Sequence, residues 1–208
     1  MRLYHYTTAS NALLIGMGKG NGLEPGLTEH GAITGFQTMG RPCVWLTKEE
    51  TNAITPAFAA HYDRIGIEHA GIGNPRFGGP VRCEIDVERS RHLMRWTEFL
   101  RTTKIVGVDE AGKQITGREV LAGCNLAMAA GAADGWWINF KPIPTSRIFI
   151  PLTREQAIEG CEWQLNTAEG EALEQWTAQR DSFGAMPAGT IFGFQNGECR
   201  VYSMEKAA

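Results

Sequence analysis

The sequence predicts a mixed α+β fold built from short, mostly antiparallel strands with short flanking helices. Three observations support this prediction. Apolar and polar residues alternate in several short runs, as they do in half-buried strands. Helical periodicity is confined to short segments between these runs. Near the end of the chain, Asn196-Gly197 joins two strand-like runs, and this dipeptide is the strongest short-range signal for an antiparallel hairpin.

Each element is predicted from its residue pattern and from the residues that end it. A strand over 2–7 leads into a helix that Thr8 or Ser10 caps and that glycines end after Met17. Residues 81–87 alternate regularly, which predicts a strand. The other predicted strands are 43–47, 105–108 with 114–115, 136–140, 147–152, 190–195 and 198–202. The other predicted helices lie within 48–63, 90–101, 117–130 and 168–180, and the predicted loops are 24–42 and 66–80.

These elements predict one main domain with a small extension. Residues 1–152 carry most of the strands, and residues 153–208 add a helix and a hairpin that we expect to pack on the same domain. The length of 208 residues is sufficient for a core that needs no disulfides or metal.

Composition narrows the classes of partner. The net charge is −3 and basic residues form no run, so bulk attraction to nucleic-acid phosphates is not expected. The 5 cysteines are widely spaced without a Cys-x-x-Cys pair, which argues against zinc and redox motifs. We see no signal-peptide pattern and no apolar run long enough for a membrane span. The expectation is a cytoplasmic protein without a metal site, in a bacterium or a phage-infected cell.

A recognisable pattern lies in the first strand and the segments that follow it. The strand contains Leu3-Tyr4-His5-Tyr6-Thr7, the next helix is followed by Gly22-Leu23, and the second strand is Val44-Trp45-Leu46-Thr47. This pattern resembles the ADP-ribosyltransferase superfamily, in particular its diphtheria-toxin-like and poly-ADP-ribose-polymerase-like branch. To about residue 152 the chain also resembles a group of uncharacterised bacterial and phage proteins. The resemblance implies a fold of split antiparallel sheets and NAD as the substrate.

The resemblance also implies roles for individual residues. His5 would hydrogen-bond a ribose hydroxyl, the main chain of Tyr6 would hold the nicotinamide carboxamide, and Thr7 would supply an adjacent hydroxyl. Trp45 would stack on the nicotinamide ring, with Thr47 beside it.

Further candidates come from the later strands. Arg82 could bind the pyrophosphate bidentately. Trp136 and Trp137 must point to opposite faces of a strand, and Trp137 is the one we assign to the cleft.

The superfamily also carries a glutamate on a late strand, where it stabilises the transition state. The matching strand here, 136–140, contains no glutamate. The candidate catalytic acids are therefore Asp134 and Glu84, with Glu119 as an alternative. Each candidate also has a structural alternative: His5 as a satisfied strand histidine, Trp45 as a core residue, and Arg82 with Glu84 as an ion pair.

The function expected from the resemblance is mono-ADP-ribosyl transfer from NAD to a protein or nucleic acid, as a toxin or in phage–host conflict. One alternative is a sensor, sponge or inhibitor that binds NAD or ADP-ribose without turnover. Others are a transferase that acts on RNA and a structural phage protein with a tryptophan-rich interface.

Overall fold

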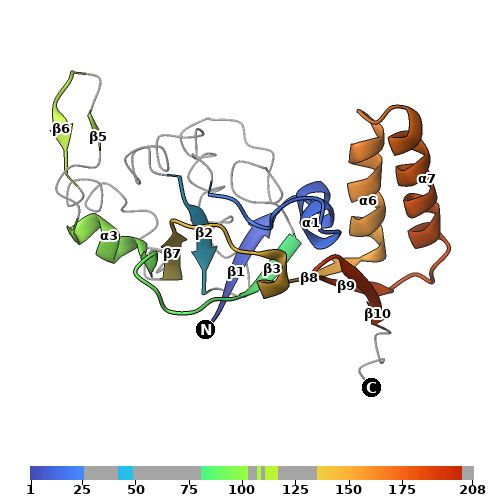
Figure 1. The fold of residues 1–208 in the computed structure, drawn as a ribbon, viewed down its shortest axis with the longest axis horizontal. Coiled ribbons are helices and arrows are strands. Elements are labelled where there is room, and N and C mark those ends of the chain that lie inside the picture. Colours follow the sequence, from blue (N-terminus) through green and yellow to red (C-terminus); the bar gives the residue numbers. More distant parts are fainter. Residues whose placement is uncertain (26–41, 49–80, 103–106, 109–110, 117–134, 203–208) are drawn as a thin grey trace, which may run out of the picture.

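A computed structural model describes residues 1–25, 42–48, 81–102, 107–108, 111–116 and 135–202 (Figure 1). Its strands are β1 Arg2–Thr7, β2 Val44–Thr47, β3 Val81–Asp86, β4 Leu93–Arg95, β5 Gly107–Val108, β6 Gln114–Ile115, β7 Trp136–Asn139, β8 Ile148–Thr153, β9 Ile191–Gln195 and β10 Glu198–Tyr202. Its helices are α1 Ala9–Gly16, α3 Trp96–Thr102, the 3-10 turn η3 Thr145–Arg147, α6 Arg154–Leu165 and α7 Gly170–Gly184. The α+β class is confirmed.

The main sheet contains eight strands in the order β10-β9-β8-β3-β1-β2-β7-β4, and all described pairings are antiparallel. Strands β5 and β6 form a separate two-stranded ribbon. The resemblance implies two separate sheets, whereas these eight strands form one continuous sheet. The two halves are joined at β1, which pairs with β3 on one edge and with β2 on the other. The β1–β2 connection is narrow, since it consists of a single register pair, Tyr4 with Thr47.

The main core lies between one face of the sheet and the helices α1 and α6. Helix α1 contacts β3, β8 and α6, and α6 packs in turn against α7 (Figure 1). The buried side chains on this face of the sheet include Leu3, Cys83, Ile85 and Ile150. Each fully buried aliphatic side chain of this kind stabilises the fold by about 1.5–3 kcal/mol relative to exposure. Burial of this face therefore fixes which residues of β1 and β3 point away from the helices.

Local signals explain where α1 begins and ends. The hydroxyl of Thr8 accepts from the backbone N–H of Asn11 at 3.3 Å, so Thr8 is the N-cap. After α1, Gly18 takes a positive φ of 69° and turns the chain. Gly22 also has a positive φ, and its close approach to the Ile143 carbonyl leaves no room for a side chain.

Two expectations for individual elements were wrong. Residues 90–101 were predicted to be helical throughout, but Leu93–Arg95 form β4 and pair with β7 before α3 begins. Helix α6 was not predicted. Its N-terminus carries a capping box in which the Thr153 hydroxyl accepts from the Gln156 N–H and the Gln156 side chain accepts from the Thr153 N–H. The Thr-x-x-Gln spacing is visible in the sequence and could have identified the helix.

Each of the other expected elements is either confirmed or lies outside the described residues. The C-terminal hairpin is confirmed, with Asn196 and Gly197 at positive φ between β9 and β10. The predictions for 48–63, 66–80 and 117–130, and most of that for 24–42, lie outside the described residues.

Candidate functional site

His5 lies in the middle of β1, next to the narrow β1–β2 connection. Its Nδ1 is 2.9 Å from the backbone carbonyl oxygen of Trp45 on β2. Because a carbonyl oxygen can only accept, Nδ1 carries the proton and donates this hydrogen bond. Burial lowers the pKa of His5 from its ordinary value of 6.5, and the hydrogen bond to Trp45 opposes part of that effect.

The imidazole is therefore neutral at pH 7, with Nε2 as its unprotonated nitrogen. No partner for Nε2 is found in the part of the chain that the structure describes. A neutral histidine held in this tautomer presents one hydrogen-bond acceptor, and the hydroxyl of a sugar is a suitable donor to it.

The strand register divides the remaining candidates between the two faces of the sheet. His5 pairs with Cys83, whereas Tyr4 and Tyr6 pair with Glu84 and Arg82. Successive side chains of a strand point to opposite faces. We call the face of His5, which packs on α1 and α6, the helix face, and the face of Tyr4 and Tyr6 the tyrosine face.

Trp45 and Thr47 belong to the tyrosine face, because Thr47 pairs with Tyr4. The Trp45 ring lies 6.3 Å from the Trp96 ring and 6.0 Å from the Trp136 ring, measured between centroids. We call these three residues the tryptophan cluster. Trp45 is half-buried, and its Nε1 finds no hydrogen-bond partner among the described residues. The structure thus brings the Trp45 carbonyl to His5 but places the Trp45 ring across the sheet from the His5 ring.

Arg82 and Glu84 form the ion pair that was the structural alternative for these two residues. The Arg82 Nη2 lies 3.1 Å from the Glu84 carboxylate, and Arg2 approaches the same carboxylate at 3.4 Å. The Arg82 guanidinium also lies over the Tyr4 ring, 5.2 Å from its centroid. Both residues are therefore held on the tyrosine face, away from the imidazole of His5.

Thr7 and Trp137 lie on the helix face with His5. Thr7 is buried at the end of β1, and Trp137 is half-buried on β7 opposite Leu46. The guanidinium of Arg95, a residue that the sequence did not single out, lies 5.7 Å from the centroid of the Trp137 ring. Arg95 could not be singled out from the sequence, because this segment was predicted to be a helix. A helix assignment does not indicate that Arg95 lies opposite Trp137 on a neighbouring strand.

The acidic residues of the described strands all lie on the same face of the sheet. Glu84, Asp86 and Glu198 all lie on the tyrosine face, as the register through β3, β8, β9 and β10 shows. No described strand residue on the helix face is Asp or Glu. Asp134 and Glu119 lie outside the described residues.

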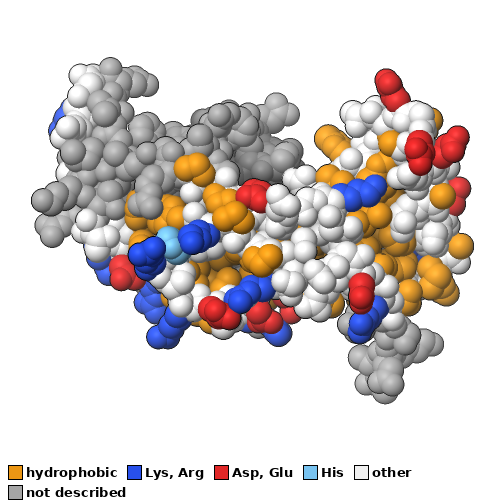
Figure 2. Space-filling model, viewed as in Figure 1, with side chains coloured by type: hydrophobic (Ala, Val, Ile, Leu, Met, Phe, Trp, Pro, Cys, Tyr) orange, Lys and Arg blue, Asp and Glu red, His pale blue; other side chains and the backbone are white. Residues whose placement is uncertain are grey.

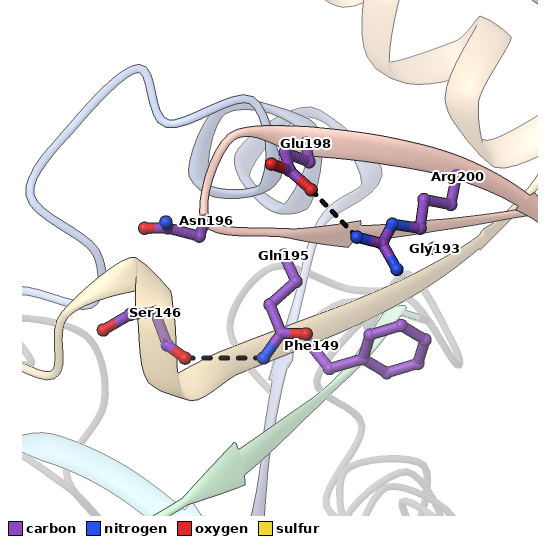
Figure 3. Close-up of a pocket in the computed structure, with 7 residues that line it drawn as sticks. All are labelled: Ser146, Phe149, Gly193, Gln195, Asn196, Glu198 and Arg200. Atoms are coloured by element: carbon purple, nitrogen blue, oxygen red, sulfur yellow. Dashed lines mark hydrogen bonds and ion pairs between the residues drawn. The ribbon is translucent and has the colours of Figure 1, made fainter.

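A hollow of about 300 Å³ lies farther along the sheet, where β8, β9 and β10 meet (Figure 3). The residues that line it are Ser146, Phe149, Gly193, Gln195, Asn196, Glu198 and Arg200. The Gln195 amide reaches the Ser146 carbonyl at 3.4 Å, and Arg200 pairs with Glu198 at 3.1 Å (Figure 3). The hollow therefore has a polar lining in which the arginine charge is balanced by its neighbour.

Comparison with known proteins does not assign this site. The chain matches no family model, and no curated protein or solved structure is significantly similar to it. Within the described residues, no group of three or more His, Cys, Asp or Glu side chains is arranged to hold a metal ion. None of the helices described has the length and hydropathy needed to cross a membrane.

Proposed function

We propose that the protein binds NAD or a related ADP-ribose-bearing nucleotide beside His5, in a site of the ADP-ribosyltransferase type. One observation carries the proposal. The Trp45 carbonyl fixes the proton on Nδ1 of a desolvated imidazole, which leaves Nε2 as an acceptor. A ribose hydroxyl donates to that nitrogen, and the sequence resemblance supports a nucleotide as the bearer of the ribose.

Binding can be tested by calorimetric titration with NAD and with ADP-ribose. In the variant His5→Asn, the side-chain amide can still donate to the Trp45 carbonyl, but the acceptor at the Nε2 position is missing. A lost hydrogen bond of about 0.5–1.5 kcal/mol weakens binding by roughly 2- to 12-fold. His92→Asn, in the loop before β4, is the control and should bind as the parent does. Failure of the parent protein to bind either nucleotide would refute the proposal.

Binding without turnover is the form of this function that the described residues favour. Transfer of ADP-ribose breaks the bond between nicotinamide and ribose. Nicotinamide then leaves, and an acceptor group that loses a proton forms the new bond to the anomeric carbon. A nearby carboxylate stabilises the positive charge that develops on the sugar. The acids of the described strands lie on the face opposite His5, where Glu84 is already paired with two arginines.

Transfer of ADP-ribose to a protein or nucleic acid is the second candidate, and it is supported by the resemblance of the first two strands. It requires an acid from the remainder of the chain, for which Asp134 is the sequence candidate. Incubation with labelled NAD and cell extract distinguishes the two functions. Incorporation of the label into a macromolecule, together with release of nicotinamide, would establish transfer if Asp134→Asn abolishes both. Binding of ADP-ribose without any release would establish a sensor, sponge or inhibitor.

A further inference from the structure

We propose that β10 is an interaction surface for a second copy of this chain, with the two β10 strands pairing antiparallel about a twofold axis at Cys199. Strand β10 is at the end of the sheet order, so one of its edges has no neighbouring strand among those described. An open strand edge presents unpaired N–H and C=O groups to any strand that can pair with it. This surface consists of β10 alone, and pairing through it does not require nucleotide binding.

The hairpin determines which main-chain groups of β10 face outward. Gln195 and Glu198 flank the two-residue turn and pair with each other. In a hairpin of this length the flanking residues form a hydrogen-bonded pair, and the hydrogen-bonding direction alternates along the strand. The N–H and C=O of Cys199 and Val201 therefore point to the open edge. A twofold axis at Cys199 makes its two copies a hydrogen-bonded pair that donates and accepts reciprocally.

The charges on β10 favour this register over its neighbours. Glu198 and Arg200 lie on the same face, on either side of Cys199, and they are 71% and 75% exposed (Figure 3). With the axis at Cys199, Glu198 of each copy faces Arg200 of the other. An axis at Glu198 or at Arg200 would instead place identical charges directly opposite each other, which destabilises a strand pair.

The exposed β10 side chains on the helix face are consistent with a second copy of the chain as the partner. Val201 is 53% exposed, and Cys199 is also exposed. Figure 2 shows acidic and basic side chains side by side near the foot of the molecule at β10, with no large field of one sign. In the twofold arrangement, Val201 lies opposite Gly197 of the second copy, a position with no side chain to obstruct it.

Crosslinking tests the register directly. Residues in a hydrogen-bonded antiparallel pair have Cα atoms about 5.5 Å apart, which is within the range that a disulfide spans. Diamide, which accepts the two electrons and two protons released by a pair of thiols, should convert the protein to a covalent dimer linked through Cys199. Cys199→Ser should abolish that dimer. If peptide mapping finds the crosslink at another cysteine, or finds none, the register is refuted.

A charge exchange tests the interface without the cysteine. Glu198→Arg alone converts two attractive pairs into repulsive ones and should raise the dimer dissociation constant by about tenfold. The double variant Glu198→Arg, Arg200→Glu restores complementarity, so its dissociation constant should return to near that of the parent. Light scattering over a range of protein concentrations provides the measurement. A monomeric parent protein, or a double variant as weak as the single one, would overturn the proposal.

Discussion

The titration of His5 gives the most direct prediction about the candidate site. In the folded protein, burial holds the pKa of His5 below 6.5, the ordinary value that applies to the unfolded chain. The unfolded state therefore takes up a proton more readily than the folded state. The stability linked to His5 is fully present above pH 6.5 and is lost as the pH falls through the folded pKa.

The size of the effect is bounded by the uptake of one proton on unfolding. Each pH unit between the folded and unfolded pKa values removes about 1.4 kcal/mol from the free energy of unfolding. His5→Asn is the matched variant, since it keeps a donor for the Trp45 carbonyl and cannot titrate. We expect it to lie within roughly 1 kcal/mol of the parent near neutral pH, the scale of a single hydrogen bond. At acid pH the difference should turn in favour of the variant.

Urea unfolding of both proteins between pH 7.5 and 5 provides the assay, and the difference between their curves removes the contribution of every other group. Nucleotide affinity of the parent should decline only at lower pH, as the pH approaches the folded pKa of His5, because a protonated Nε2 can no longer accept a hydrogen bond. Parallel stability curves for the parent and His5→Asn would refute the assignment of His5 as a desolvated, neutral imidazole.

Three further outcomes are expected. Gly22→Ala should destabilise the fold by about 2 kcal/mol or more in thermal unfolding, because its φ is +104° and a Cβ would collide with a backbone carbonyl. The control Gly184→Ala on α7 should be neutral or stabilising by up to about 1 kcal/mol, because its Cβ would meet no atom of the described residues within 4 Å. With a thiol reagent at pH 8, peptide mapping should show labelled Cys199 and unlabelled Cys83, because burial raises the pKa of Cys83 to about 12. Glu84→Gln should lower the free energy of unfolding, because it removes the ion pairs with Arg2 and Arg82, and it should leave any nicotinamide release intact. Loss of release in a folded variant would contradict the assignment of Glu84 to the face away from His5.

Much of the fold could be predicted from periodicity and turn chemistry. The alternation in β3, the cap at Thr8 and the Asn196-Gly197 turn are local signals, and each determines local structure whatever lies around it. Strand β4 could not be predicted in this way. It is three residues long, and it forms because β7 offers an edge to pair with, which is a property of the tertiary structure.

The candidate site was harder to predict because residue types and spacing do not specify which strands are neighbours. The sequence assigns His5 and Trp45 to one cleft through a resemblance and predicts no direct interaction between them. The structure joins them through a hydrogen bond from the imidazole to the Trp45 carbonyl, while their rings lie on opposite faces of the sheet. For Arg82 and Glu84 the sequence left two possibilities open, a pyrophosphate ligand with a catalytic acid or an ion pair. The ion pair that forms follows from their shared face and two-residue spacing. Register is the missing information, because a shift of one residue exchanges the two faces of a strand.

The same register constrains where a nucleotide can lie if His5 holds its ribose. On the tyrosine face, Arg82 is committed to Glu84 and to the Tyr4 ring. On the helix face, Arg95 of β4 is the cation that the described strands provide, and it lies over Trp137. Strands are spaced about 4.8 Å apart, so the three steps from β1 to β4 separate the two backbones by about 14 Å. A long guanidinium side chain shortens that distance, which favours Arg95 over Arg82 as the partner of a pyrophosphate.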